Sequence, residues 1–224
     1  MVDDEENLVR LLRGYLEREG FEVHAALDGP SALEAARRLD PDLVVLDWML
    51  PGLDGMEVLR GLRRFSGAYV VVLTARSEEV DKIVGLSTGA DDYMTKPFSP
   101  GELVARTRAM LRRPRGSATD TPEEPRLDLD GLTIDPGARE VRLGDEAVNL
   151  TALEFDLLLT LASRPGFVFS RSRLLDRVWG HDRFGGEHVV DVHVANLRKK
   201  LGDDHSRPRY VETVRGVGYR FVKG

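Results

Sequence analysis

Apolar residues in the first half of the chain follow the spacing of helices in some stretches and form short unbroken runs in others. The first helical pattern has apolar residues three or four positions apart: Leu8, Leu11, Leu12, Tyr15 and Leu16. We expect Asn7 to cap this helix and Gly20 to end it. Further helices are expected at residues 31–39, 58–62, 79–88 and 100–112, and strands at 21–25, 43–46, 70–73 and 92–95. Helices alternating with short apolar strands predict an α/β fold with a doubly wound parallel sheet.

From residue 126 the pattern changes. Residues 126–150 alternate apolar and polar side chains between turns such as Asp130-Gly131, which predicts an antiparallel sheet. Thr151 with Glu154 forms a capping-box motif at the start of a helix, and two more helices are expected at 171–179 and 187–201. Strand-forming residues around Gly216 and Gly218 predict a terminal hairpin. Three helices followed by a hairpin are typical of a winged helix-turn-helix domain.

The segment between these two patterns reads PRGSATDTPEEP, with three prolines and no large apolar residue. This composition predicts a linker, stiffened in part by proline. We therefore place one domain at residues 1–113, the linker at 114–125 and a second domain at 126–224. A length of 224 residues suits two domains of ordinary size.

Composition excludes several classes of protein. The chain has no cysteine, which excludes a disulfide framework, a thiolate metal site and a cysteine nucleophile. No apolar run approaches the roughly 18 residues that span a bilayer, and no leader-like segment precedes the first acidic residues. We therefore expect a cytoplasmic protein with no membrane partner.

The net charge of −6 conceals an asymmetry. Residues 1–113 contain 20 acidic and 15 basic side chains, whereas residues 126–224 contain 15 acidic and 16 basic ones. An acidic first domain favours a cation or phosphate site, and a more basic second domain favours a polyanionic partner.

Five polar residues fall where strands of the predicted parallel sheet end: Asp3, Asp4, Asp47, Thr74 and Lys96. Ligands of open α/β sheets bind at this edge. Three carboxylates gathered there would repel one another without a cation. A hard divalent ion such as Mg²⁺ would compensate their negative charge. Asp47 could then act as a nucleophile toward a phosphoryl group, with Lys96 and Thr74 donating to its oxygens. The simpler alternative is that each acid only caps a helix or strand, which explains one residue better than it explains all five.

The helix expected at 187–201 has an apolar face formed by Val190, Val194, Leu197 and Leu201. The opposite face is basic and amide-bearing, with Arg198 near its edge; it carries Val192, His193, Asn196, Lys199 and Lys200. Such a helix suits the major groove of DNA. Arg215, at the tip of the terminal hairpin, could reach a phosphate or the minor groove. The alternative is a solvated basic face, the usual explanation of an isolated run of charge.

The first domain carries motifs of a known family. The segments VDDEEN, LVVLDWMLPGLDG, VVVLTA and GADDYMTKPFSPGELVAR resemble the receiver domain of bacterial two-component response regulators, which has a flavodoxin-like fold. The resemblance implies that Asp47 is the phosphoacceptor. It implies that Asp3, Asp4, Asp47 and the Met49 backbone carbonyl surround Mg²⁺, and that Thr74 and Lys96 contact phosphoryl oxygens. It further implies that Tyr93 is an aromatic switch residue and that Lys96-Pro97 is a cis peptide.

One part of the receiver pattern is short. Members of the family have a complete apolar strand before the acidic pair, and here only Met1-Val2 precede it. That strand lies centrally in the sheet of the family. Either the true start lies upstream or the domain is only marginally stable; because every later element is intact, we expect a truncated or mis-assigned start.

The second domain resembles the winged-helix effector domain of the OmpR/PhoB subfamily in LTALEFDLLLTLASRPGFVFSRSRLLDRVWG, VVDVHVANLRKKLGD and RPRYVETVRGVGYRFV. By this resemblance, 187–201 is the recognition helix, 180–187 a loop that meets RNA polymerase and 213–219 the wing. A sensor histidine kinase would phosphorylate the receiver, which would then form a homodimer that binds tandem half-sites of double-stranded DNA. Lys82 with Glu102, and Asp92 with Arg106, resemble the ion pairs between subunits; the alternative is that they are surface pairs worth ~0–1 kcal/mol.

Together these patterns indicate a phosphorylation-dependent, DNA-binding transcriptional regulator rather than a multiple-turnover enzyme. Two other functions stay open. An aspartyl-phosphate phosphohydrolase commonly has a second Asp two residues after its nucleophile, where this chain has Met49. A DNA-binding protein that does not respond to phosphorylation is the other alternative, because the first strand is so short.

Overall fold

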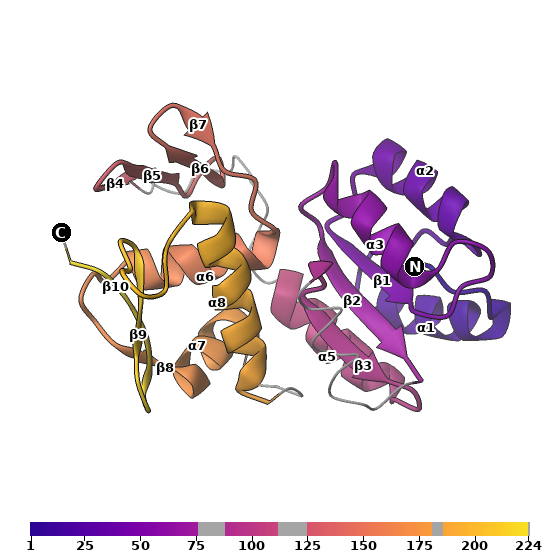
Figure 1. Cartoon of the computed structure of the whole chain (residues 1–224). Coiled ribbons are helices and arrows are strands. Elements are labelled where there is room, and N and C mark those ends of the chain that lie inside the picture. The colour runs from indigo at the N-terminus through magenta and orange to yellow at the C-terminus, as the bar shows by residue number, and fades with distance from the viewer. Residues whose placement is uncertain (76–87, 112–124, 181–185, 224) are drawn as a thin grey trace. The chain divides into compact units, whose positions relative to one another are not determined.

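The computed structural model describes residues 1–75, 88–111, 125–180 and 186–223, and it divides into two compact units, Met1–Leu111 and Arg112–Gly224 (Figure 1). Each unit is described by itself. The predicted helix at 79–88, apart from Thr88, lies outside the described residues, as does the predicted linker apart from Pro125. In the described part of the chain, no helix is both long and apolar enough to cross a membrane.

The N-terminal unit is built on a parallel sheet in the order β1 (Leu43–Asp47), β2 (Tyr69–Thr74) and β3 (Asp92–Thr95). All six residues of β2 are buried, as their apolar run predicts. Val2 extends the sheet beyond β1 with single parallel bridges to Leu46 and to Ala26. The predicted doubly wound parallel sheet is confirmed.

Four described helices cover the sheet: α1 (Glu6–Arg18), α2 (Gly29–Leu39), α3 (Gly55–Arg63) and α5 (Pro100–Leu111). Figure 1 shows α2 and α3 on one face and α1 and α5 on the other. Alternate residues of β1 and β2 pack under α2 and α3 in one apolar core, which includes Val44, Leu46, Val70, Val72, Ala32, Ala36, Val58, Leu59 and Leu62.

Short polar motifs fix where these helices begin. Asp28 caps α2 by accepting from the Ser31 N–H at 2.8 Å, and Asp54 with Glu57 forms a capping box on α3. The cap predicted at Asn7 is wrong, because Glu5 holds the N-cap position of α1 and Asn7 lies within the first turn. The predicted end at Gly20 is confirmed by its positive φ of 86°.

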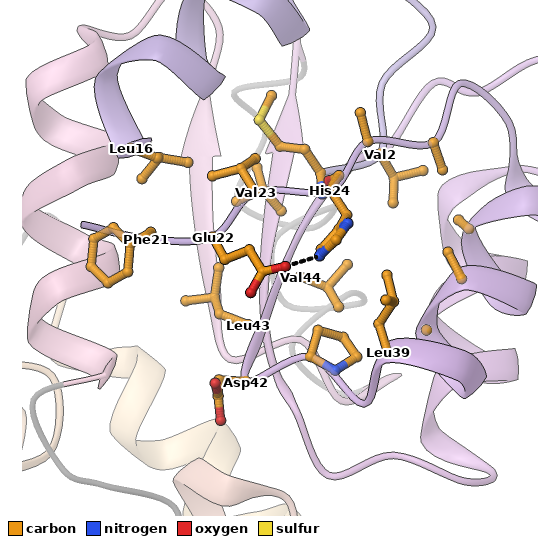
Figure 2. Close-up of a pocket in the computed structure, with 18 of the residues that line it drawn as sticks. Val2, Leu16, Phe21, Glu22, Val23, His24, Leu39, Asp42, Leu43 and Val44 are labelled. Atoms are coloured by element: carbon orange, nitrogen blue, oxygen red, sulfur yellow. Dashed lines mark hydrogen bonds and ion pairs between the residues drawn. The ribbon is translucent and has the colours of Figure 1, made fainter. Parts of the chain in front are cut away.

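The strand predicted at residues 21–25 is absent, and only the next residue, Ala26, makes a β-bridge. A strand needs a neighbour along its length, and here the neighbour is limited to the first residues of the chain. Val23 is buried and lines a pocket (Figure 2), but the backbone of the segment has no described partner strand along its length.

The C-terminal unit begins with an antiparallel sheet of β4 (Leu127–Leu129), β5 (Leu132–Asp135), β6 (Glu140–Leu143) and β7 (Glu146–Ala147). Helices α6 (Ala152–Ala162), α7 (Arg171–Val178) and α8 (His188–Leu201) follow. The strands β8 (Phe169–Ser170), β10 (Gly218–Phe221) and β9 (Val211–Val214) form a second sheet in that order. This arrangement confirms the winged helix-turn-helix prediction.

Two sequence motifs shape this unit. The predicted capping box at the start of α6 is present, with the Thr151 N–H donating to Glu154 at 2.8 Å and the Glu154 N–H donating to the Thr151 hydroxyl at 3.3 Å. The predicted terminal hairpin joins β9 to β10 through a turn in which Gly216 has a φ of 74°. Apolar residues of all three helices, such as Leu158, Leu174 and Leu197, are fully buried beneath the hairpin sheet.

The close packing at the start of α3 predicts that adding one methyl group at Gly55 lowers the free energy of unfolding. A Cβ added at Gly55 would lie 2.5 Å from the backbone oxygen of Asp47, whereas a Cβ at Gly14 in α1 would meet nothing within 4 Å. We expect Gly55→Ala to destabilise the unit by about 1–3 kcal/mol through overpacking. Gly14→Ala should instead stabilise it by about 0.5–1 kcal/mol through helix propensity. Urea unfolding of both variants measures the difference, and equal effects would show that α3 does not approach β1 this closely.

Candidate functional site

Three carboxylates meet at the edge of the parallel sheet where the strands end. Asp3 directly follows the bridging residue Val2, Asp47 ends β1, and Asp4 lies beside them. One oxygen of each carboxylate lies within 4.8 Å of the other two. Asp3 and Asp47 are buried and Asp4 is exposed, so the cluster is reached from the Asp4 side. The structure brings together the three acids that the sequence predicted.

Lys96 supplies a positive charge to this cluster from beyond the end of β3. Its Nζ lies 3.0 Å from Asp3 Oδ2 and 3.3 Å from Asp47 Oδ2. Glu5, which the sequence analysis did not single out, lies 3.5 Å from the same Nζ. The Lys96 N–H donates to the Thr74 carbonyl at 2.7 Å, which fixes the lysine beside β2. Lys96-Pro97 is cis, as the resemblance implied.

The pKa values of both Asp47 and Lys96 are shifted in this cluster. Burial raises the pKa of the Asp47 carboxyl; Lys96 opposes this rise and the Asp3 charge adds to it. Burial by itself would lower the pKa of Lys96, but the hydrogen bond to Asp3 and the charge of Asp47 outweigh burial, so its pKa lies above the usual range. Lys96 is therefore a fixed cation at this site.

Three other predicted residues lie on the same strands or just beyond them. Thr74 is buried at the end of β2, and the N–H of Trp48, next to Asp47, donates to the Leu73 carbonyl at 2.9 Å. The Tyr93 ring is half-buried with its centroid 6.1 Å from that of Trp48. The Met49 side chain is 59% exposed, so it lies at the solvent side of the strand end.

The donor set of the cluster suits a hard divalent cation. Carboxylate oxygens are the ligands that Mg²⁺ prefers, and one lysine does not neutralise three carboxylates. An ion at this position would remove the repulsion between the two buried acids, which would otherwise favour protonation of one of them.

Helix α8 in the second unit exposes some of its predicted surface residues and buries others. Lys199 is exposed, Val192 and Asn196 are half-buried, and Arg215 is exposed at the turn of the hairpin. The prediction that His193 lies on the outer face is wrong. It is 1% exposed and its ring packs on Trp179 at a centroid distance of 5.4 Å.

Arg198 also points inward rather than along the edge of the outer face. Its guanidinium donates to the Val211 carbonyl at 2.7 Å and to the Thr213 hydroxyl at 2.8 Å, and the residue is 9% exposed. Lys200 has an ion-pair partner on α6, because its Nζ lies 2.5 Å from Glu154 Oε2. Periodicity alone did not show that these cations bind other elements of the same domain.

Comparisons with known proteins match a family to each of the two units. Residues 1–108 match the family described as response regulator receiver domain, and residues 145–221 match the family described as transcriptional regulatory protein, C terminal. DNA-binding response regulator MtrA of Mycobacterium tuberculosis is 48% identical over 220 residues, which cover 98% of this chain and 94% of MtrA. The chain is a response regulator of the OmpR/PhoB subfamily.

Two further matches cover almost the whole response regulator. Alkaline phosphatase synthesis transcriptional regulatory protein PhoP of Bacillus subtilis is 44% identical over 226 residues, covering 98% of this chain and 94% of PhoP. The solved structure of a cysteine mutant of RitR is 30% identical, with a TM-score of 0.78 over 100% of this chain and 97% of that one. The two-domain architecture is therefore shared over the full length.

Three of the four predicted dimer residues of the response regulator, Asp92, Glu102 and Arg106, pair within one chain. Arg106 on α5 makes ion pairs with Asp92 and, at 2.6 Å, with Glu102. The structure places the Asp92–Arg106 pair inside one chain, whereas the sequence prediction placed it between subunits. Both residues of the pair are buried; burial raises the pKa of the Asp92 carboxyl, and the Arg106 charge opposes this rise. Lys82 lies outside the described residues.

Sequence reasoning missed two buried polar groups that hold elements in place. Asp91 accepts from the Val70 N–H at 2.7 Å and from Arg63 at 2.7 Å, which ties the start of β3 to β2 and α3. Its only sequence signal was the pair of adjacent acids before Tyr93. In the second unit Asp203 accepts from the Val211 N–H at 2.8 Å and so anchors the start of β9.

A polar network also fixes α8 against the hairpin. The Tyr219 hydroxyl donates to Asp191 on α8 at 2.6 Å, and Arg171 at the start of α7 donates to the same carboxylate at 2.6 Å. Burial and the bond to Asp191 raise the pKa of Tyr219 to about 12, so its hydroxyl stays protonated as the donor. Helix α8 and the terminal hairpin are thus held in one orientation.

The inward position of Arg198 predicts a structural effect of its loss. Arg198→Met keeps an apolar stem but leaves the Val211 carbonyl without these donors, and we expect a loss of about 1–3 kcal/mol in the free energy of unfolding. Lys199→Met, one residue on and exposed, should stay within about 0.5 kcal/mol. Urea unfolding of the two variants is the measurement. An Arg198→Met protein as stable as Lys199→Met would contradict the structural role.

Proposed function

We propose that Asp47 accepts a phosphoryl group from a sensor histidine kinase and that this modification controls binding to DNA. The observation that carries the proposal is the placement of Asp47, a buried carboxylate at a strand end, within 4.8 Å of two other acids and 3.3 Å from Lys96. Membership of the response-regulator family supports the same assignment.

The residues present fit a bound Mg²⁺. Asp4, Asp47 and the Met49 backbone carbonyl would ligate the ion, and Asp3 would assist largely through water. When bound, Mg²⁺ supplies positive charge that offsets the negative charge of the incoming phosphoryl group. Lys96 stays protonated and presents its ammonium group to the same space.

In the transfer itself, a carboxylate oxygen of Asp47 attacks the phosphorus of a phosphohistidine. An O–P bond forms, the P–N bond breaks, and its electron pair stays on the imidazole of the kinase. Lys96 and the Thr74 hydroxyl then donate to phosphoryl oxygens. Because Thr74 ends β2 and Lys96 directly follows β3, their movement toward the phosphoryl group would reach Tyr93, the proposed aromatic switch residue on β3.

We propose slow self-hydrolysis of the acyl phosphate rather than multiple turnover of free substrates. Attack by water needs a positioned base, and Met49, two residues after Asp47, has no basic group. The response regulator would then hold its signal until the phosphoryl group is lost. The absence of an Asp at this position distinguishes the site from that of an aspartyl-phosphate phosphohydrolase.

The first test of the proposal is chemical labelling. Acetyl phosphate with Mg²⁺ should add one phosphoryl group to the protein as an acid-stable, base-labile acyl phosphate, detected by intact mass. Asp47→Asn should abolish the label. Asp40→Asn is the matched control, because Asp40 is an exposed acid of the same unit at a φ of 41° that asparagine also adopts. Labelling of Asp47→Asn at the rate of the control would refute the assignment.

For DNA binding, we propose that α8 enters the major groove. Asn196 would read a base edge, Val192 would pack on a thymine methyl, and Lys199 and Arg215 would contact phosphates or the minor groove. His193 and Arg198 are left out of this interface because they are buried, and Lys200 is secondary because it pairs with Glu154.

The proposed interface predicts that substitutions at Asn196 and at Lys199 affect DNA binding in different ways. Asn196→Ala should lose about 1–3 kcal/mol on the best site, relax preference at one base pair and leave the salt dependence unchanged. Lys199→Ala should weaken binding to all sequences and lower the salt slope by about one unit. Binding to an operator library across a salt series distinguishes them. Equal weakening of every sequence by Asn196→Ala would exclude the base contact.

We further propose that phosphorylated receivers form a homodimer, which places two effector domains on tandem half-sites of double-stranded DNA. Lys82 and Glu102 are the proposed pair between subunits. The loop at residues 180–187 would contact RNA polymerase, although most of it lies outside the described residues. A cytoplasmic location fits each of these partners and the family.

A further inference from the structure

Four exposed side chains gather around the turn between α6 and α7, and the proposed DNA contacts use none of them. They form what we call the arginine–phenylalanine cluster: Arg164, Phe167, Arg173 and Arg177. The segment 164–177 contains four arginines and one acid, the half-buried Asp176. The fourth arginine, Arg171, is already paired with Asp191. Positive charge is thus concentrated here, although residues 126–224 as a whole are nearly neutral, with 15 acidic and 16 basic side chains.

Aromatic rings hold the guanidinium groups of the cluster close together. The Cζ atoms of Arg164 and Arg173 lie 5.3 and 5.2 Å from the centroid of the Phe167 ring. The Cζ atom of Arg177 lies 5.6 Å from the centroid of the Phe169 ring, which meets the Phe167 ring edge to face at 4.8 Å. A guanidinium that stacks on a ring keeps its N–H edge open, and this edge binds phosphate or carboxylate through paired hydrogen bonds.

The positive charge of the cluster is only weakly compensated within the chain. Among the described residues, Arg164 and Arg173 have no ion-pair partner. Arg173 and Arg177 are four residues apart on α7, a spacing at which like charges repel. Arg173 also lies in the first turn of α7, where the helix dipole disfavours a cation. Such placements cost stability in the isolated chain, which favours an anionic partner outside it.

The cluster is continuous with the surface that meets DNA in the proposed function. Strand β8, which follows Phe167, pairs with β10 at Ser170 and Gly218, close to the hairpin turn that carries Arg215. The two backbones are in tight contact there, since a Cβ added at Gly218 would lie 2.0 Å from the Phe169 oxygen. Figure 1 shows β8 leading from the hairpin sheet into α7. The guanidinium groups of the cluster therefore lie on the side of the hairpin sheet opposite β9.

A further cation lies at the edge of the cluster. Lys223 is exposed just beyond β10, and a Cβ added at Gly166 would lie 3.6 Å from the Lys223 Cβ. The Gly166 N–H donates to the Phe221 carbonyl at 2.8 Å, which fixes the turn after α6 against the end of β10. The positive surface thus extends from the first turn of α7 to the last described residue of the chain.

We propose that the arginine–phenylalanine cluster binds the phosphate backbone of double-stranded DNA and so extends the interface formed by α8 and Arg215. This inference rests on the proposed function, because it assumes that the second unit binds DNA. A row of guanidinium groups suits the regularly spaced phosphates of a duplex. DNA fits better than an acidic protein surface, because the cluster continues the surface already proposed to lie on the duplex.

The test compares two pairs of arginines in the full-length protein. One variant carries Arg164→Gln with Arg173→Gln. The control carries Arg142→Gln with Arg207→Gln, which removes the same charge from exposed residues on β6 and after α8. Binding to the best site of an operator library is measured across a salt series. The cluster variant should lower the salt slope by about two units and weaken binding by roughly tenfold at low salt, whereas the control should resemble the wild type. Equal slopes for the cluster variant and the control would overturn the proposal.

A lysine variant separates loss of contact from loss of structure. Arg164→Lys with Arg173→Lys keeps both charges but lacks the planar fork of arginine. It should therefore recover most of the salt slope and only part of the affinity. If the lysine variant binds as poorly as the glutamine variant and with the same reduced slope, the charges do not meet phosphates and the proposal is wrong.

Ethylation of single DNA phosphates locates the contact. At least one phosphate whose ethylation weakens binding of the wild type should have no effect on the variant with Arg164→Gln and Arg173→Gln. This phosphate should differ from those whose effect is lost in Arg215→Gln. Identical interference patterns for the wild type and the cluster variant would overturn the proposal.

The same measurements distinguish this inference from the proposed function. If the cluster variant binds like the control while Asn196→Ala still relaxes base preference, only the inference about the cluster fails. If the wild type shows no preference for any DNA sequence before or after treatment with acetyl phosphate, the proposed function fails and the inference fails with it. Reduced transcription by the cluster variant with unchanged DNA binding would assign the cluster to an acidic protein partner and would also overturn the proposal.

Discussion

Repulsion among three carboxylates at one edge of a parallel sheet is the constraint on which the receiver depends. Asp3, Asp4 and Asp47 have oxygens within 4.8 Å of one another, and two of the three are buried. Lys96 offsets part of this charge from the end of β3, where a hydrogen bond to the Thr74 carbonyl fixes its backbone. The positions of β1, β2 and β3 are therefore coupled to the charge at Asp47. A phosphoryl group there would change the balance that holds the three strand ends together.

The second unit depends on a different set of polar contacts. Arg198 and Asp191 are both on α8, yet one donates to β9 and the other accepts from Tyr219 on β10. These bonds fix the angle between α8 and the hairpin, which decides what the exposed residues of α8 can reach. In the proposed function, the polar contacts of Arg198 and Asp191 set the geometry of this unit, and outward side chains such as Lys199 and Asn196 meet the DNA.

Sequence patterns predicted the architecture well, because apolar periodicity and capping motifs act locally. The buried strand at β2 and the capping box at Thr151 are examples in which a few adjacent residues suffice. The acidic site was also predictable, because strand ends of a parallel sheet meet at one edge. The geometry confirmed that Asp3, Asp4, Asp47 and Lys96 come together.

The misses have a common physical cause. His193 and Arg198 have polar side chains at positions that helical periodicity places near the surface, but contacts from other elements bury them. The segment at 21–25 has the composition of a strand, yet a strand forms only where a neighbour exists. Each miss concerns a contact between elements, which no local pattern reports.

The central claim is that a charge change at Asp47 in the first unit controls DNA binding by the second. The direct measurement is the affinity of the full-length protein for its best DNA site, before and after treatment with acetyl phosphate and Mg²⁺. The account predicts that treatment tightens binding by roughly tenfold or more, and that Asp47→Asn binds with the same affinity before and after treatment. Equal affinities of the labelled and unlabelled wild-type protein would contradict it.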